Sequence, residues 1–516
     1  MTAFRPRLRW IGPLAVLLVA TALRVWGLGT PDRLVFDEIY YVRDALSQLT
    51  HGYSTTWPTA STDLLGDAAH AFSDQANAMA HPPLGKWMIG LGFLLLGSDT
   101  AWAWRISAAV VGIATVGLTM RLAWLISRST PMATLAGLFL AVDGVHVVMS
   151  RVGLLDVFLT LLIVVGSICI WRDQLGRGTL THSAWWRPWL LAAGAAFGTA
   201  AAVKWSGLTA LAAFLLLVTA RDLSRRIRAA APSRGARLSA SLGALGQAGM
   251  TAAFALPAAF ITYLASWLGW ILHPGAQHRQ PGEPWWASLW QWHVDAFAWH
   301  TNLTAAHPYQ AAPLGWPLGL RPTLMMWEYS EPGTGCPWAG GCVTEISPIP
   351  NLIVTWGGAL ALLLLCWVLA HAAWIRVRGA RPGASTHLRI GAPRSPGLWA
   401  IAFVVTGFLS GWLPWVLTVS RSAVFQFYAV AFAPFSALAL ALVLGAFAAR
   451  RPAVPVLALA GVQLDPSTEA VRGRRLAVAI VAASALALGL VFFPMWAAVP
   501  MPEWFWRAHI WLPGWR

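Results

Sequence analysis

Near its start the chain reads RPRLRWIGPLAVLLVATALRVWGL, residues 5–28, in which three arginines precede a long apolar run. A transmembrane helix needs about 20 mainly apolar residues, and this run is long enough. A secretory signal peptide begins in a similar way, but no convincing small-residue cleavage site follows. We therefore interpret residues 11–28 as a first membrane span, with the arginines on the cytoplasmic side.

The composition of the whole chain also indicates a membrane protein. Of 516 residues, 57% are hydrophobic and 11% are charged, and the mean hydropathy is +0.59, values that a soluble domain of this size could not tolerate. The formal net charge of +16 would suggest a nucleic-acid partner in a soluble protein. Here 34 of the 36 basic residues are arginines, mostly in short runs between apolar segments. Such runs set membrane orientation, so we expect no nucleic-acid partner.

Eleven apolar segments are candidates for spans. They cover residues 11–28, 101–124, 132–149, 152–171, 188–203, 205–220, 249–272, 351–375, 397–419, 423–449 and 476–499. With a cytoplasmic N-terminus, the basic segments between them all fall on the cytoplasmic side, as the positive-inside rule requires. The sequence therefore predicts an all-α polytopic membrane protein with about eleven transmembrane helices and an N-terminus inside the cell.

The predicted topology leaves two longer loops, 29–100 and 273–350, outside the cell, and they hold 13 of the 20 acidic residues. We divide the chain into a transmembrane region 1–272 that includes the first loop, the second loop 273–350, and a four-span region 351–516. Cys336 and Cys342 lie in a Pro/Gly-rich part of the second loop, where an external location favours a disulfide over two free thiols. The histidines of this loop lack a metal-ligand spacing, and we expect no metal site.

The first external loop opens with RLVFDEIYY, residues 33–41, which places Asp37 and Glu38 directly after the first span and beside aromatic residues. Such surroundings can adjust a carboxylate to act as a base, although an ordinary solvated loop would also carry such a pair. Further along, His81 and Lys86 flank a Pro-Pro turn. That string alone is also consistent with a helix-entry turn and a snorkelling lysine.

Several charges inside apolar runs fall at the external side once directions are assigned. They are Arg24, Arg105, Arg151, Asp156, Lys204 and Arg421. Snorkelling to the interface explains any one of them, but together with Asp37, Glu38 and His81 they favour a polar cavity that opens outward. A surplus of cations beside a carboxylate pair suits an anionic lipid head group, because guanidinium and ammonium groups bind phosphate oxygens.

A set of short motifs, in order along roughly residues 20–435, resembles one known family. The motifs are RLVFDEIYY (33–41), HPPLGK (81–86), WRI (104–106), SRVGLLD (150–156), VKWSG (203–207), HPY (307–309) and Arg421 with FQFY (425–428). Together they resemble the protein O-mannosyltransferases of the GT-C membrane glycosyltransferases, particularly the actinobacterial type. No single motif is specific; the ordered set is.

The resemblance implies a polyprenyl-phosphate-mannose donor, Ser or Thr acceptors on secreted proteins, and inversion at the anomeric carbon, in a bacterial plasma membrane with the active site outside. Asp37 matches the catalytic base and Glu38 an acceptor-holding position. The implied donor-binding residues are Arg105, Lys204, Arg421, Gln426, His81, Lys86, Asp156 and Arg24, and the implied acceptor-loop residues are His307 and Tyr309. No obligatory metal or other cofactor is implied, because protein cations can stabilise the departing phosphate.

The resemblance to the eukaryotic members is incomplete, because loop 273–350 is too short to hold their additional lumenal sugar-binding domain. Acceptor selection would then rest on the loops or on a partner such as the secretion channel. Two other functions stay open. One is a GT-C enzyme that glycosylates a lipid or a cell-wall glycan, and the other is a non-catalytic lipid-linked sugar transporter. The sequence shows no clear internal repeat of the kind that transporters often have.

Overall fold

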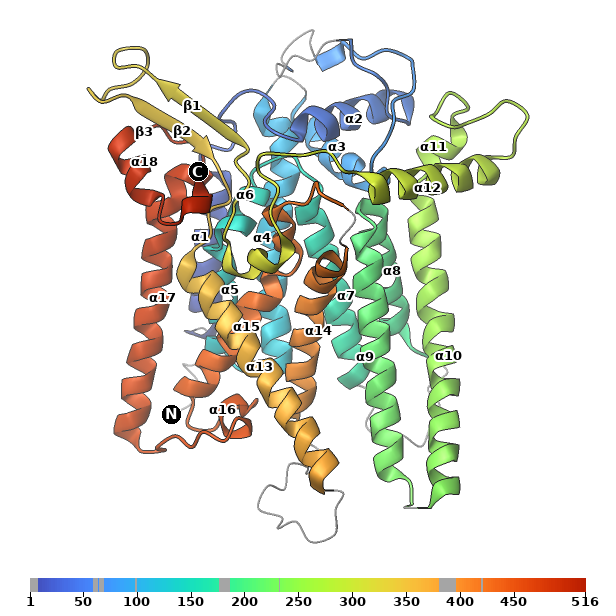
Figure 1. The fold of residues 1–516 in the computed structure, drawn as a ribbon, viewed down its shortest axis with the longest axis vertical. Coiled ribbons are helices and arrows are strands. Elements are labelled where there is room, and N and C mark those ends of the chain that lie inside the picture. The colour runs from blue at the N-terminus through green and yellow to red at the C-terminus, as the bar shows by residue number, and fades with distance from the viewer. Residues whose placement is uncertain are drawn as a thin grey trace.

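The computed structural model describes residues 8–58, 64, 69–97, 100–175, 186–231, 233–379, 396–418 and 421–516. Long helices run side by side, and connecting segments gather at one end of the bundle (Figure 1). Eleven described helices overlap the eleven predicted segments: α1 (Ile11–Val25), α4 (Ala101–Ser127), α5 (Thr130–Ala141), α7 (Asp156–Leu175), α8 (Pro188–Val203), α9 (Ser206–Ala229), α10 (Arg234–Ala265), α13 (Leu352–Gly379), α14 (Pro396–Leu417), α15 (Ala433–Ala448) and α17 (Thr468–Trp496).

The loop-rich end contains the elements of the two predicted external loops, the last residues of the predicted span 249–272, which form a separate short helix, and the C-terminal segment. It holds α2 (Glu38–His51), α11 (Leu268–Leu272), α12 (Trp285–Asn302), β1 (Met326–Ser330), β2 (Cys342–Ile346), β3 (Met501–Pro502) and α18 (Glu503–His509) (Figure 1). The loop between α2 and α4 also folds into an apolar helix, α3 (Leu84–Leu96). The predicted external loops are therefore largely folded, and α2 and α12 are their longest helices.

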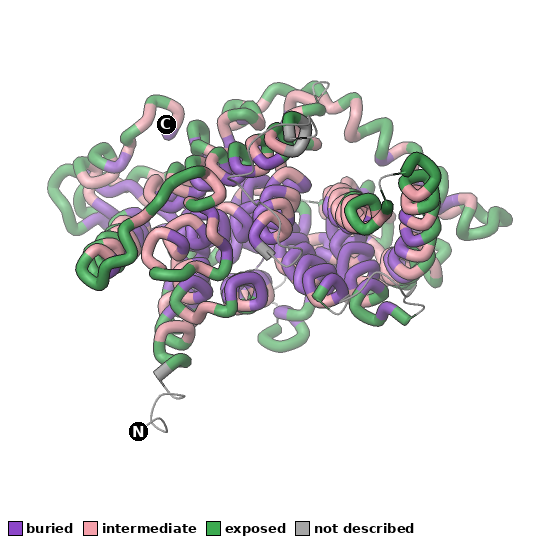
Figure 2. The backbone as a smooth tube through the Cα atoms, turned by 90° about the horizontal axis from the view of Figure 1, so that it is seen from below, coloured by how far each residue is buried: buried purple, intermediate pink, exposed green. Residues whose placement is uncertain are grey.

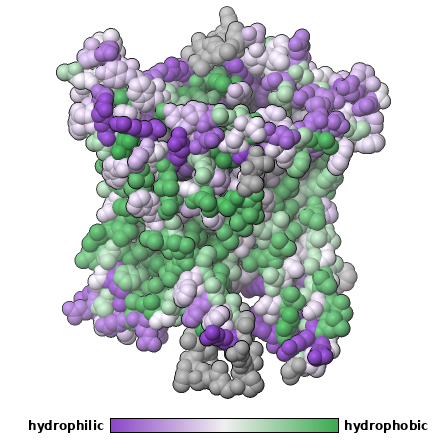
Figure 3. Space-filling view, viewed as in Figure 1, coloured by the Kyte–Doolittle hydropathy of each residue, from purple (hydrophilic) through white to green (hydrophobic). Residues whose placement is uncertain are grey.

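The distribution of apolar surface fits a membrane protein. Six helices, α4, α9, α10, α13, α14 and α17, are long and apolar enough to cross a bilayer, while α1, α3, α5, α8 and α15 are apolar but shorter. On the face shown in Figure 3, a broad hydrophobic band crosses the middle of the molecule, and hydrophilic residues lie above and below it. The mainly helical membrane fold is confirmed at this level, and the number of eleven spans stays a prediction.

The structure corrects three details of the predicted fold. The segment 132–149 is not one helix, because the Asp143 side chain accepts a hydrogen bond from the His146 N–H (2.8 Å) and caps a separate helix, α6 (Gly144–Met149). The segment 423–449 is also divided, into the 3-10 helix η4 (Gln426–Ala431) and α15. The chain is not all-α, because β1, β2 and β3 form an antiparallel sheet in the order β1-β2-β3.

Strands β1 and β2 form a hairpin whose connecting loop is tied to the start of β2 by a disulfide. Ser330 on β1 lies opposite Cys342 on β2, and Cys342 forms a disulfide with Cys336, with a Cα–Cα distance of 5.6 Å. This is the pairing that the sequence favoured. In the body of the molecule the most buried backbone lies at the centre of the bundle (Figure 2). Helix α8 packs so closely on α10 that a Cβ at Gly198 would lie 2.2 Å from the Ala259 carbonyl oxygen, an approach that small residues permit.

Candidate active site

The Glu38 side chain, at the first turn of α2, is fully buried and saturated with hydrogen bonds. Arg105 on α4 donates from Nε to Oε1 and from Nη2 to Oε2, both at 2.9 Å. The backbone N–H groups of Gly153 (2.7 Å) and Val35 (2.9 Å) donate to the same carboxylate. A buried ion pair needs such additional hydrogen bonds to offset the desolvation of its charges.

Arg105 also holds the loop that precedes α2. Its Nη1 donates to the carbonyl oxygens of Leu28 (3.2 Å) and Pro31 (2.9 Å), and its Nη2 to that of Arg33 (2.9 Å). All three nitrogens of the guanidinium are therefore bonded within the protein. The roles implied by the resemblance, acceptor holding for Glu38 and phosphate binding for Arg105, stay predictions, and the geometry favours a positioning role for both.

Asp37 precedes Glu38 but lies in different surroundings. Its backbone follows Phe36, which has a φ of 50°, a left-handed conformation that is unusual for a bulky residue. The Phe36 ring is held edge-on by Phe425 (6.1 Å) and Phe427 (5.7 Å). Burial raises the pKa of the Asp37 carboxyl to about 6, with Lys204 lowering it and Asp156 raising it. A carboxyl with a pKa near neutrality is suited to accept a proton.

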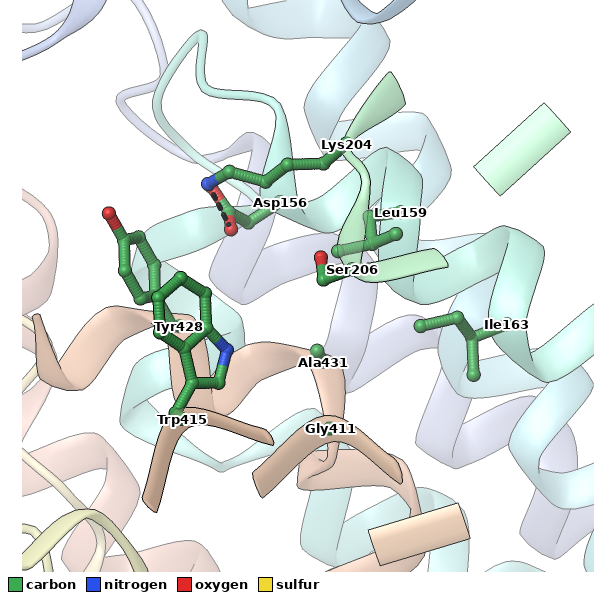
Figure 4. A pocket seen from close by; sticks show the side chains of 9 residues that line it. All are labelled: Asp156, Leu159, Ile163, Lys204, Ser206, Gly411, Trp415, Tyr428 and Ala431. Atoms are coloured by element: carbon green, nitrogen blue, oxygen red, sulfur yellow. Dashed lines mark hydrogen bonds and ion pairs between the residues drawn. The ribbon is translucent and has the colours of Figure 1, made fainter. Parts of the chain in front are cut away.

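Lys204 lies at the sharp turn between α8 and α9. Its backbone is extended, and Gly207 permits the turn, because a Cβ there would lie 2.4 Å from the Ala201 nitrogen. The Lys204 Nζ donates to both carboxylate oxygens of Asp156, at 2.8 and 3.0 Å. It also lies 4.4 Å from the centre of the Tyr428 ring. The turn therefore presents an ammonium group between an acidic side chain and an aromatic ring (Figure 4).

A cavity begins at this ion pair. Its lining comes from α7, the α8–α9 turn, α14 and η4, and consists of Asp156, Leu159, Ile163, Lys204, Ser206, Gly411, Trp415, Tyr428 and Ala431 (Figure 4). Trp415 stacks on Tyr428 with ring centres 4.8 Å apart. The lining is therefore polar and cationic at one end and apolar along α7 and α14. The sequence had indicated a polar cavity, and the structure adds that one side of it is apolar.

Arg421 and His81 lie near this cavity, linked by His300 of α12. Arg421 Nη1 lies 3.0 Å from His300 Nδ1, and its guanidinium is 5.8 Å from the Trp415 ring centre. The His81 ring stacks on His300 at 5.2 Å. Lys204 and Arg421 both lower the pKa of His81 and of His300, although burial is the largest cause in each case. These interactions place two predicted donor-binding residues in one electrostatic environment with Lys204.

Gln426, at the start of η4, is buried, and neither polar atom of its side chain has a hydrogen-bond partner among the described residues. A buried amide without partners is costly unless something else bonds it. His307 contacts the Asp37 turn, because its ring lies 4.9 Å from Phe425 and 6.4 Å from Phe36. The Tyr309 N–H donates to His307 Nδ1 at 3.1 Å.

Lys86 and Arg24 lie in separate hydrogen-bonded clusters. Lys86 is buried, pairs with Asp44 at 3.2 Å and donates to the His81 carbonyl oxygen at 3.0 Å, so the snorkelling interpretation of this lysine was wrong. Arg24 donates to the carbonyl oxygens of Ala20, Leu140 and Ala141 and contacts His146 Nδ1 at 2.8 Å, which ties α1 to α5 and α6. Their substrate-binding roles stay predictions that these contacts do not favour.

Three residues near the site were not among the predicted site residues: His300, Trp415 and Tyr428. Tyr428 stood in a motif that the sequence analysis quoted, but an aromatic residue in an apolar segment gives no signal of its own. His300 lay in a His-rich stretch, from whose spacing we concluded only that a metal site was not expected. Among the described residues, no group of three His, Cys, Asp or Glu side chains could hold a metal ion.

Comparison with known proteins places this geometry in a family. Residues 14–264 match the family model described as dolichyl-phosphate-mannose-protein mannosyltransferase, and residues 285–515 match the C-terminal four-transmembrane region of protein O-mannosyltransferases. The polyprenol-phosphate-mannose–protein mannosyltransferases of Mycolicibacterium smegmatis and Mycobacterium tuberculosis are each 29% identical to the chain. The alignments cover 98% of this chain and 93% of the first relative, and 99% and 92% for the second.

A solved structure shows the same fold. The Saccharomyces cerevisiae protein O-mannosyltransferase Pmt1-Pmt2 complex bound to the sugar donor matches with a TM-score of 0.72 at 14% identity, over 100% of this chain and 93% of that chain. The two family models together span most of the sequence, and the likeness to the bacterial relatives is nearly full-length. The chain therefore belongs to the protein O-mannosyltransferase family, as a membrane-bound glycosyltransferase of the bacterial polyprenyl-phosphate-mannose type.

Proposed function

We propose that this enzyme transfers mannose from polyprenyl-phosphate-mannose to Ser or Thr hydroxyls of secreted proteins at the external membrane face, with inversion. The observation that carries the proposal is the Lys204–Asp156 pair at the polar end of the cavity, electrostatically coupled to the Asp37 carboxyl. A cation for a departing phosphate and a base for an incoming hydroxyl thus belong to one site. The donor and acceptor classes agree with the names of the bacterial relatives.

The chemical character of the cavity lining suits the two parts of the donor. A lipid phosphate would meet the Lys204 ammonium and the Arg421 guanidinium, since charged hydrogen bonds to phosphate are strong. The free protein leaves room there for about one water molecule, so the first isoprene units would pack on Leu159 and Ile163 after the donor has opened the cavity. The Asp156 partner keeps the Lys204 ammonium in place before the donor arrives. This arrangement supports a lipid-linked sugar donor over a soluble sugar nucleotide.

The proposed step is a single displacement. The acceptor Oγ attacks the anomeric carbon of mannose from the face opposite the phosphate, and a new C–O bond forms. The bond between the anomeric carbon and the phosphate oxygen breaks, and its electron pair leaves with polyprenyl phosphate. The hydroxyl proton passes to an Asp37 carboxylate oxygen. Lys204 and Arg421 stabilise the charge that develops on the phosphate, so the proposal requires no metal ion.

The side of the membrane follows from the arginines. The last turns of α9 and the first turn of α10 are rich in arginine, from Arg221 to Arg237, and lie at the end of the bundle opposite α2 and α12 (Figure 1). Basic connections stay in the cytoplasm. The loop-rich end with Asp37 would then face outward, where the secretion channel supplies unfolded acceptor proteins.

The deciding experiment measures transfer of labelled mannose from polyprenyl-phosphate-mannose to a Ser/Thr-rich secretory peptide. Membranes would contain the wild type, Asp37→Asn, or Asp74→Asn, an exposed acid of the same loop, at equal amounts. The proposal is supported if the wild type and the control label the peptide and Asp37→Asn does not. The Asp37→Asn variant should still bind the donor lipid. Label in lipid or glycan instead of peptide would point to the alternative acceptor class. Movement of the lipid without any transfer would point to a transporter.

A further inference from the structure

His300 of helix α12 lies near the cavity, because it contacts Arg421, whose guanidinium is 5.8 Å from the ring centre of the lining residue Trp415. On one side of the ring, Nδ1 lies 3.0 Å from Arg421 Nη1; on the other, Nε2 lies 2.7 Å from the Ala80 carbonyl oxygen. The face of the ring stacks on His81 at 5.2 Å, and Trp205, next to Lys204, lies 5.8 Å away. Two hydrogen bonds and two ring contacts therefore fix both the position and the orientation of this imidazole.

The partners determine the protonation state of His300. A guanidinium can only donate, so Nδ1 must accept and carries no proton. A carbonyl oxygen can only accept, so Nε2 carries the proton and donates to Ala80. His300 is thus neutral, in agreement with a pKa that burial lowers to about 4. The neutral imidazole is an acceptor aimed at Arg421.

Arg421 uses only part of its hydrogen-bonding capacity within the protein. Its Nε donates to the Ala423 carbonyl oxygen at 3.0 Å and its Nη1 reaches His300. In the part of the chain that the structure describes, Nη2 has no protein acceptor. Because two of its nitrogens are hydrogen-bonded, the guanidinium is held in one orientation. Its third nitrogen can still donate a hydrogen bond to a ligand.

We propose that His300 is a positioning residue, which holds the Arg421 guanidinium at the cavity so that its open donor reaches the phosphate of the lipid-linked sugar. The inference rests on the proposed function, because it presupposes a phosphate at the polar end of this cavity. His300 itself touches neither the sugar nor the acceptor. Its contribution is to remove the orientational freedom of Arg421 before the donor binds, which lowers the cost of binding.

Two substitutions of His300 test the roles of its two ring nitrogens separately. In His300→Asn the side-chain oxygen takes roughly the place of Nδ1 and still accepts from Arg421, while the bond to Ala80 is lost. In His300→Gln the longer amide can donate to Ala80 in place of Nε2, while the acceptor for Arg421 is lost. We expect the KM for donor to rise about tenfold in His300→Gln, the effect of one hydrogen bond to a charged group. His300→Asn should stay within about threefold of the wild type, and the KM for peptide should not change in either.

A double-mutant comparison tests whether His300 acts through Arg421. If it does, His300→Gln should add little to the donor KM of Arg421→Ala, because contacting residues in one network are not additive. Gln291→Ala, an exposed residue of the same helix, is the control for α12 itself. Equal donor KM values for the Asn and Gln variants, or additive effects in the double variant, would overturn the positioning role.

Binding of polyprenyl phosphate to the purified full-length variants provides a readout that does not depend on transfer. Weaker binding in His300→Gln than in His300→Asn, at equal thermal stability, is the expected result. If the wild type binds the lipid phosphate but labels no peptide, the proposed function is wrong. The positioning role of His300 is then still decided by the binding series. A wild type that labels peptide while the His300 series binds lipid phosphate equally would defeat the inference alone.

Discussion

Asp37 and Glu38 are neighbours in the sequence and carry the same chemical group, yet the fold gives them opposite surroundings. Glu38 is fully buried, and its two oxygens accept hydrogen bonds from Arg105 and from two backbone N–H groups. Asp37 is half-buried, and burial raises the pKa of its carboxyl to about 6 although the Lys204 charge lowers it. A carboxylate whose lone pairs are all used can only hold structure. Asp37 accepts no such hydrogen bond from the described residues, so its carboxylate keeps the capacity to take a proton.

The Asp-to-Asn change at position 37 should have the largest effect on activity. Loss of a general base lowers kcat by about 10²–10⁴-fold, and we expect an unchanged amount of folded protein in the membrane. The measurement is single-turnover transfer of labelled mannose to peptide, with Asp74→Asn as the control. Activity within tenfold of the wild type would show that Asp37 is not the base.

The Glu-to-Ala change at position 38 should act on stability instead. It leaves the Arg105 charge buried without its partner, which costs about 3–5 kcal/mol. Thermal unfolding of the detergent-solubilised protein would report the loss. The double variant Glu38→Gln, Arg105→Met should recover part of it, because neither charge is then left alone. A Glu38→Ala variant that is stable but inactive would instead favour the acceptor-holding role.

The pH dependence of transfer should follow Asp37. Because its pKa is raised from 3.8 to about 6, the base is ionised above about pH 6 and protonated below. We expect kcat/KM to be half of its plateau value near pH 6, to approach the plateau at neutral pH, and to fall as the pH drops below 6. The measurement is the rate profile between pH 4.5 and 7.5. An inflection near 4 would mean that the buried environment does not act on the catalytic group.

The smallest expected effect is on thermal stability, where substitutions at Asp37 and at Glu38 should change the Tm in opposite directions. The raised pKa means that the folded state binds the Asp37 proton more readily than the unfolded state. Its stability contribution is therefore complete below the unfolded pKa and is lost as the pH rises through about 6. At pH 7, Asp37→Asn should have a higher Tm than the wild type, while Glu38→Gln has a lower one. Equal signs for the two changes would remove the contrast.

Much of the architecture could be predicted because membrane helices are encoded locally. Runs of about 20 apolar residues and the arginines between them gave the positions of the helices, the two loops and the cluster of polar residues around Asp37, Lys204 and Arg421. Where a local signal competes with the apolar run, the prediction failed: Asp143 starts a new helix inside the segment 132–149. The β1–β2 hairpin was missed because its strands have only five residues each.

The sequence by itself therefore determined the membrane character, the family and the residues available for chemistry. Only the tertiary structure decided how those residues are used: Arg105 pairs with Glu38, Lys86 with Asp44, and Lys204 with Asp156. The partners of Arg105 and Lys204 lie 67 and 48 residues away in the chain, and His300 lies 121 residues from Arg421. The physical reason is that an ion pair depends on distance and desolvation in three dimensions, and neither follows from the local period of apolar and polar residues.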